Sequence, residues 1–266
     1  MKKVQQSVYI LLMMSIACFV SAEAVKDATL ESLMVLSGIN SQIQDIPVGV
    51  KAGVLASRGG VSSGKDTHFD KAVDQLFNAD QIQAEVYREV AKAISEQDAQ
   101  KLLTWYESNL GNRIARAEEY AATPQAMAEM QATVQVLMSD ETRMPIARKL
   151  METGDILDKG LQMQQSMMTA VQVAATKYLK PNDKVALDEI SKMIEAQQPR
   201  VQQIIEQSIL LNIAYTFRDF EIAELESYIE TLKKEEMQKF NSGALNGMVI
   251  ALEKAAKEMA STSVSI

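Results

Sequence analysis

The chain has 266 residues, 47% of them apolar, and its 35 acidic residues outnumber its 27 basic ones to give a net charge of −8 at pH 7. Because nucleic acids and anionic lipids are attracted by clusters of Lys and Arg, this composition argues against nucleic acid as a partner. The chain has five prolines, eleven glycines and no alternating strand pattern, so we expect an all-α fold.

Residues 1–22 have the features of a secretory signal peptide. Lys2 and Lys3 precede an apolar run over residues 8–20, and Val20-Ser21-Ala22 provides the small residues of a cleavage site. The run is shorter than the roughly 20 residues of a membrane-spanning helix, so a retained anchor is the weaker interpretation. We expect cleavage after Ala22, export to the periplasm, and no stable membrane anchor in the mature protein.

The only cysteine, Cys18, lies in this segment and would leave with it. Ser15 stands where a lipid-attachment signal has Leu, so lipidation of Cys18 is also a weaker interpretation. We therefore expect a mature protein that has no disulfide and is stabilised by burial of apolar side chains.

In the first half, helices are expected to alternate with short breaks. The first helix stops near Ser37-Gly38, Pro47 interrupts the next, and residues 58–67 form a Gly/Ser loop. Asp80 is expected to cap the following helix. Ser95 and Asp98 have the spacing of a capping box, and Thr123-Pro124 is a favoured helix start.

In the second half, two amphipathic helices are expected. One face of the first carries Leu157, Leu161, Met168, Val171, Ala175 and Tyr178. The segment Lys180-Pro181-Asn182-Asp183 ends this helix. After Pro199 we expect a second buried stripe, formed by Val201, Ile204, Ile205, Ser208, Ile209 and Ile213.

The chain also repeats itself. Residues 94–118 (ISEQDAQKLLTWYESNLGNRIARAE) correspond to residues 217–241 (FRDFEIAELESYIETLKKEEMQKFN), so that Trp105 matches Tyr228. A similar echo relates Leu150-Met151-Glu152-Thr153-Gly154 to Met34-Val35-Leu36-Ser37-Gly38. We therefore expect two tandem, divergent copies of a helical bundle after the signal peptide.

The first copy is expected to span residues 25–139 and the second residues 143–262. Residues 139–144 mark the boundary between them, because they are polar and precede Pro145. The sequence leaves open whether the two copies form one domain or two.

The first of the two matching segments carries a recognisable pattern. Its members are Ser95, Asp98, Leu102, Tyr106, Ser108, Gly111 and Arg113, with Ile94, Trp105 and Asn109 at positions that otherwise hold Phe, Phe and Pro. The pattern resembles the core of a bacterial family of exported helical proteins, catalogued as domain of unknown function 2059. The second copy keeps Phe217, Glu221, Leu225 and Tyr228 but has Leu232 and Lys234 where Pro and Gly are expected.

The resemblance implies an exported helical bundle and supplies no activity. Asp98, Leu102 and Trp105 lie on one side of a helix, and Gly111 permits a bend or a close approach of the backbone. We interpret the pattern as packing rather than chemistry.

Two catalytic motifs match the loop at residues 59–66 in part. A phosphate-binding loop would have Ser or Thr in place of Asp66, and a nucleophile elbow at Ser62, with His68 nearby, would follow a strand. An all-helical chain has no such strand, so we interpret the segment as a solvated loop.

Other candidate sites have plainer explanations. The single histidine, His68, disfavours a zinc site. Acidic pairs are typical of solvated helix faces, and methionines, which can bind Cu(I), are also typical of helical cores and adaptable apolar grooves; the pairs considered are Glu85/Glu89, Glu118/Glu119, Met127/Met130 and Met163/Met167. We assign no catalytic, cofactor-binding or metal-ligating residue.

The function expected from these features is that of a non-enzymatic periplasmic protein that binds protein segments or apolar surfaces in a groove between helices. An alternative is a carrier of a small hydrophobic ligand, and a hydrolase comes third. A carrier should enclose an apolar cavity of several hundred Å³, whereas an interaction module should have an open apolar patch. The identity of the partner or ligand and the oligomeric state remain open.

Overall fold

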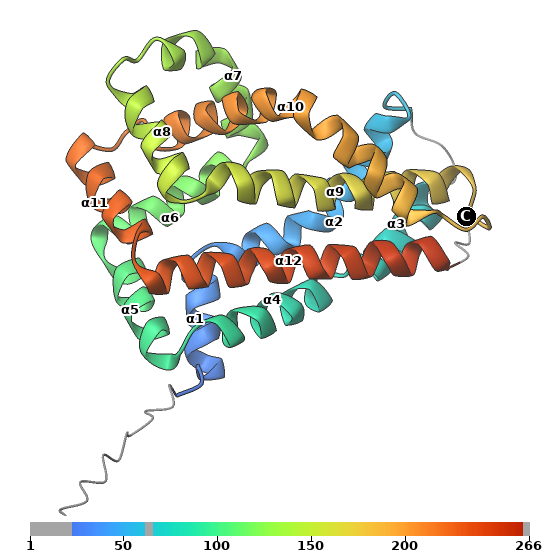
Figure 1. Cartoon of the computed structure of the whole chain (residues 1–266), viewed down its shortest axis with the longest axis horizontal. Helices are drawn as coiled ribbons and strands as arrows, with labels where there is room; N and C mark the ends of the chain where they lie inside the picture. Colours follow the sequence, from blue (N-terminus) through green and yellow to red (C-terminus); the bar gives the residue numbers. More distant parts are fainter. Residues whose placement is uncertain (1–22, 62–65, 263–266) are drawn as a thin grey trace, which may run out of the picture.

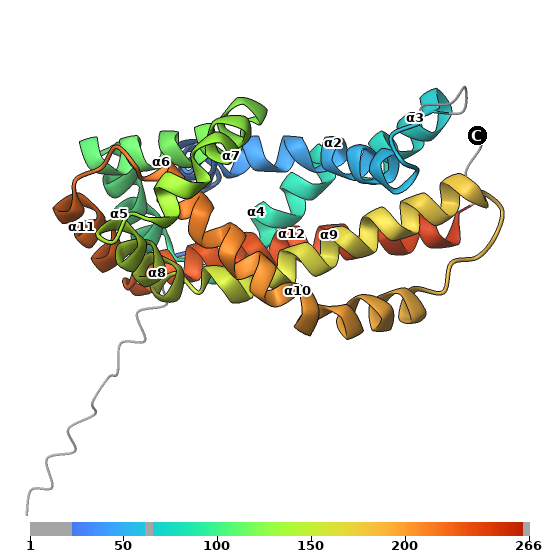
Figure 2. The same cartoon turned by 90° about the horizontal axis from the view of Figure 1, so that it is seen from above.

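A computed structural model describes residues 23–61 and 66–262, and within them the chain is all-helical (Figure 1, Figure 2). The expected fold class is confirmed. The expected signal peptide and the loop segment 62–65 lie outside the described residues. The described part contains α1 (Asp27–Leu36), α2 (Ile39–Ser57), α3 (Asp66–Leu76), α4 (Ala79–Ala93), α5 (Glu96–Glu107), α6 (Asn109–Ala121), α7 (Pro124–Met138), α8 (Arg143–Thr153), α9 (Ile156–Leu179), α10 (Leu187–Thr216), α11 (Ile222–Leu232) and α12 (Glu235–Ser261).

Helix starts follow the capping residues of the sequence. The Ser95 hydroxyl accepts the backbone N–H of Asp98 at 3.1 Å, and the Asp98 carboxylate accepts the backbone N–H of Ser95 at 3.2 Å. The expected capping box is therefore confirmed. The expected cap at Asp80 is wrong, because Asn78 accepts the Gln81 N–H and Asp80 lies in the first turn of α4.

Two prolines lie inside helices. The expected break at Pro47 is wrong, since α2 continues through it from Ile39 to Ser57. Burial of Ile43, Ile46 and Pro47 itself offsets the cost of one missing backbone hydrogen bond. Pro199 lies in the middle of α10, and Figure 2 shows the bend that divides this helix into two halves.

A single hydrophobic core runs through both halves of the sequence, from Leu30 in α1 to Ala260 in α12. The most extensive contact between two helices of this core joins α4 and α12, which lie side by side in Figure 1. A Cβ atom added at Gly247 would lie 3.0 Å from the backbone nitrogen of Val86, and one added at Gly243 would lie 3.1 Å from Val90 Cα. This spacing requires glycine at position 247 and leaves little room for a side chain at Gly243.

A buried lysine organises the turn between α9 and α10. Lys177 is 1% exposed, and its Nζ donates to the carbonyl oxygen of Asp183 at 2.6 Å. The backbone N–H of Val185 then donates to the carbonyl oxygen of Ala260 in α12, at 3.4 Å. These bonds place the start of α10 beside the end of α12.

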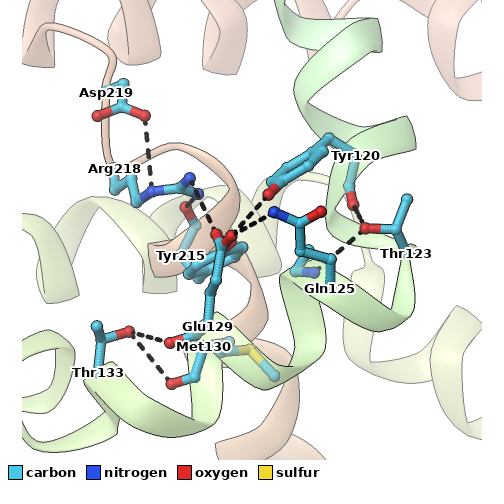
Figure 3. A network of polar contacts seen from close by, with 10 residues as sticks. Tyr120, Thr123, Gln125, Glu129, Met130, Thr133, Tyr215, Arg218 and Asp219 are labelled. Atoms are coloured by element: carbon cyan, nitrogen blue, oxygen red, sulfur yellow. Dashed lines mark hydrogen bonds and ion pairs between the residues drawn. The ribbon is translucent and has the colours of Figure 1, made fainter.

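A polar network attaches α7 to its neighbours α6 and α10 (Figure 3). The Glu129 carboxylate accepts the Tyr215 hydroxyl at 2.5 Å, the Tyr120 hydroxyl at 2.9 Å and the Gln125 amide at 3.0 Å. These bonds, that of Tyr215 first, lower the pKa of Glu129. Burial, followed by the bond to Glu129, raises the pKa of Tyr215 to about 12.

Candidate ligand-binding groove

A groove of about 360 Å³, open to solvent, lies where α9, the first half of α10 and α12 meet; the three helices can be followed in Figure 2. Its walls mix polar and apolar side chains, which explains why sequence periodicity did not mark it as a site. The lining residues are Gln162, Gln165, Ser166 and Thr169 of α9, Leu187 and Ser191 of α10, and Val249, Glu253, Ala256 and Lys257 of α12.

Several polar groups of this groove have no protein partner. Ser166 is 8% exposed, and its hydroxyl makes no hydrogen bond within the described residues. Glu253 and Lys257, one helical turn apart on α12, form no ion pair within the same part of the chain. In the open groove these groups are available for hydrogen bonds to a ligand.

An apolar cleft continues from the groove along the seam between α9 and α10. Its apolar side chains are Leu161 and Met168 of α9 with Ile194, Val201 and Ile205 of α10. The cleft has room for only about 20 Å³, so it accommodates parts of side chains rather than a whole ligand. Gln165 lines both the groove and the cleft, so the two features are continuous.

The stripe after Pro199, expected to be buried, is buried only in part, because Val201, Ile205 and Ile209 are partly buried and Ser208 is exposed. Ile213 is 6% exposed and belongs to the core, but Ile204 is 66% exposed. Met193, three turns before Ile204, is 45% exposed. The expected burial is therefore wrong for Ile204, whereas Val201 and Ile205 of the same stripe face α9 across the cleft.

Further clefts of 250 to 410 Å³ lie along α12 and between α5 and α12. They are open to solvent and lined by charged side chains such as Lys92, Lys234 and Lys254. A carrier of a hydrophobic ligand requires an enclosed apolar cavity, and these clefts are neither enclosed nor purely apolar.

The acidic pairs considered from the sequence do not form carboxylate pairs. Glu85 is 7% exposed and forms ion pairs with Lys254 and Arg88, whereas Glu89 pairs with Lys92. Glu118 is partly buried beside Tyr228, whereas the adjacent Glu119 is exposed. Each carboxylate therefore has a structural explanation.

The remaining candidates from the sequence lie apart from the groove. His68 is exposed on α3. Met163 and Met167 pack against the core, while Met127 is 51% exposed on α7. Among the described residues no group of three or more His, Cys, Asp or Glu side chains is placed to hold a metal ion.

The residues of the repeated segment meet in an aromatic junction, formed by Trp105 and Tyr106 of α5 and Tyr228 of α11. The Trp105 and Tyr228 rings stack with centroids 5.6 Å apart and planes 16° apart. The Tyr228 hydroxyl donates to the Glu118 carboxylate of α6 at 2.8 Å. The pattern is thus part of the packing between α5, α6 and α11, as the sequence led us to expect.

Burial dominates the electrostatics of this junction. Desolvation raises the pKa of Glu118 to about 7, and the hydrogen bond from Tyr228 opposes that shift only in part. Burial, with the Glu118 charge, also raises the pKa values of Tyr228 and Tyr106 well above 10. A second link between α6 and α11, from Arg113 to Glu224, lies nearer the surface and lowers the pKa of Glu224.

No family model, no curated protein and no solved structure matches this chain. The resemblance to domain of unknown function 2059 therefore stays a prediction. In the part of the chain that the structure describes, no helix combines the length and the apolar character needed to cross a membrane.

Proposed function

We propose that this chain is an exported, non-enzymatic interaction module that binds a polypeptide segment in the groove between α9, α10 and α12. The main support is that the groove contains polar groups without a protein partner, such as Ser166, and continues into an apolar cleft. Met193 and Ile204 of α10 are also exposed. A polypeptide offers both backbone amides for the polar wall and apolar side chains for the cleft.

Cleavage after Ala22, and with it export, is compatible with the contacts that Glu23 and Lys26 make with α5. The Glu23 carbonyl oxygen accepts the backbone N–H of Glu96 at 2.9 Å, and the Lys26 N–H donates to the Glu96 carboxylate at 2.9 Å. Cleavage after Ala22 would leave a mature N-terminus that is already anchored to α5. N-terminal sequencing of the protein from the periplasm tests this expectation, and a retained Met1 would contradict it.

We also infer that the two halves are divergent copies. In this correspondence α1, α2, α5 and α6 match α8, α9, α11 and α12, and α10 takes the place of α3 and α4. The inference is supported by the stacking of Trp105 on Tyr228, because equivalent side chains meet in this way at a pseudo-twofold axis. In the same scheme the last of the matched helices in each copy contacts the other copy, α12 on α4 and α6 on α10.

The groove proposal predicts site-specific crosslinking. A photo-reactive amino acid at Ser191, in the groove, should capture a polypeptide in cells, whereas the same residue at the exposed Ser227 of α11 should not. Gln162→Trp, which fills the groove from α9, should reduce the Ser191 crosslink about tenfold, equivalent to a loss of about 1.4 kcal/mol in binding. Equal crosslinking from Ser191 and Ser227, or no effect of Gln162→Trp, would contradict the proposal.

The carrier alternative has its own test. A native mass spectrum of the mature protein, purified from its own compartment, should give the mass of the bare chain if the groove takes a protein segment. Added mass of a few hundred daltons in the spectrum would instead favour a small-molecule carrier.

A further inference from the structure

The Glu118 carboxyl lies at the contact between α6 and α11, apart from the groove. It accepts one hydrogen bond, from the Tyr228 hydroxyl at 2.8 Å. Tyr228 and Tyr106 are 9% and 7% exposed, and the Trp105 ring covers the other face of the Tyr228 ring. A carboxyl in such surroundings has lost most of its hydration and gained a single donor in return.

Within the residues that the structure describes, no cation forms an ion pair with Glu118. The titratable groups that face Glu118 are Tyr228 of α11 and Tyr106 of α5. The charged side chains of the elements packed around α6 form pairs elsewhere, namely Lys101 with Asp98 on α5, Arg218 with Glu129 of α7, Glu206 of α10 with Arg148, Arg113 with Glu224, and Lys233 with Glu230 on α11. Arg116, on α6 itself, is exposed.

We propose that Glu118 is a proton-operated latch between α6 and α11, closed while its carboxyl is protonated and loosened when it ionises. The neutral acid fits between the two tyrosines at no electrostatic cost. The carboxylate favours solvent, and its displacement breaks the bond to Tyr228 and frees the ring on which Trp105 stacks. The latch does not depend on what the groove binds.

The direction of the pH dependence follows from linkage. Burial raises the pKa of Glu118 from 4.5 to about 7, so the native protein holds a proton that the unfolded chain has lost between these values. The stabilisation by the closed latch is complete below pH 4.5 and is lost as the pH rises through about 7. The equilibrium constant for unfolding should thus rise about tenfold or more from pH 5 to pH 8 through this group.

The chain contains its own reporter, because Trp105 is its single tryptophan. We expect the emission of Trp105 to change with a midpoint near pH 7 in the wild-type protein and to stay constant in Glu118→Gln, whose neutral amide oxygen still accepts from Tyr228. His68 is the single histidine of the chain, so His68→Gln is the matched control and should keep the transition. A transition that persists in Glu118→Gln, or that disappears in His68→Gln, would overturn the proposal.

A second measurement covers the case in which Glu118→Gln does not fold. With ¹³C-labelled glutamate carboxyls in the wild-type protein, NMR should show one carboxyl that titrates near pH 7, well above the usual range of a glutamate side chain. If every glutamate titrates below about pH 5.5, Glu118 is an ordinary solvated acid and there is no latch.

Discussion

Replacing Gly247 with valine should lower the free energy of unfolding by about 4 kcal/mol or more, a loss at the upper end for a single substitution. The new side chain would meet the backbone of α4, with its Cβ 3.0 Å from Val86 N and 3.2 Å from the Glu85 carbonyl oxygen. Backbone atoms cannot rotate away, so α12 would have to move off α4 and uncover the core. Urea unfolding followed by far-UV circular dichroism measures the loss.

A matched control is available in α2. A Cβ at Gly49 would have its nearest neighbour 4.0 Å away, at the end of the flexible Met167 side chain. Gly49→Ala should therefore leave stability unchanged or raise it by up to about 1 kcal/mol, since alanine favours a helix more than glycine does. If Gly247→Val unfolds at the same urea concentration as wild type, the contact between α4 and α12 is wrong.

The second large effect is expected at Gly111, the glycine of the sequence pattern. A Cβ here would lie 2.8 Å from the carbonyl carbon of Trp105 and still closer to its oxygen, at the tight turn from α5 into α6. Gly111→Ala should cost about 3 kcal/mol, because the turn must open and the aromatic junction must shift with it. The Trp105 emission should move to longer wavelength at the same time, as the ring gains contact with water.

Asn109→Pro is the companion variant for this turn. Asn109 is the first residue of α6, where the N–H has no helical partner, and Ser108 before it has the extended backbone that proline requires (φ −64°, ψ 157°). We expect a change of no more than about 1 kcal/mol, in the stabilising direction. A Gly111→Ala variant as stable as Asn109→Pro would show that the turn has room for a side chain.

Local sequence signals were sufficient to predict those features of the structure that depend only on residues adjacent in the chain. The capping box at Ser95 and the start at Thr123-Pro124 require only a few consecutive residues, and both are present. The break after Leu179 is also confirmed. The break predicted at Pro47 was wrong, because burial of the neighbouring side chains offsets the cost of a proline inside the helix. That burial depends on the whole fold and not on neighbours along the chain.

The candidate site could not be predicted because it is formed by three helices that are separated in the sequence. Periodicity predicts an apolar stripe along this part of α10, but it cannot tell which of its side chains another helix covers. Ile213 is buried, whereas Ile204 lies on the opposite side of the helix and is exposed. Ser166 gave no signal, since a serine inside an apolar stripe is unremarkable until its hydroxyl is found without a partner. The proximity of Glu118 to Tyr228 likewise depends on long-range packing alone.

The close contact between α4 and α12 has a consequence for the nascent chain. Val86 and Val90 on α4 are completely buried, yet the helix that covers them, α12, is synthesised long after α4. Until residues 235–261 emerge, the first half exposes an apolar groove that its own sequence cannot close. Burial of this face must therefore wait until residues 235–261 have been synthesised, and a molecular chaperone that shields α4 during that delay would protect the protein from aggregation.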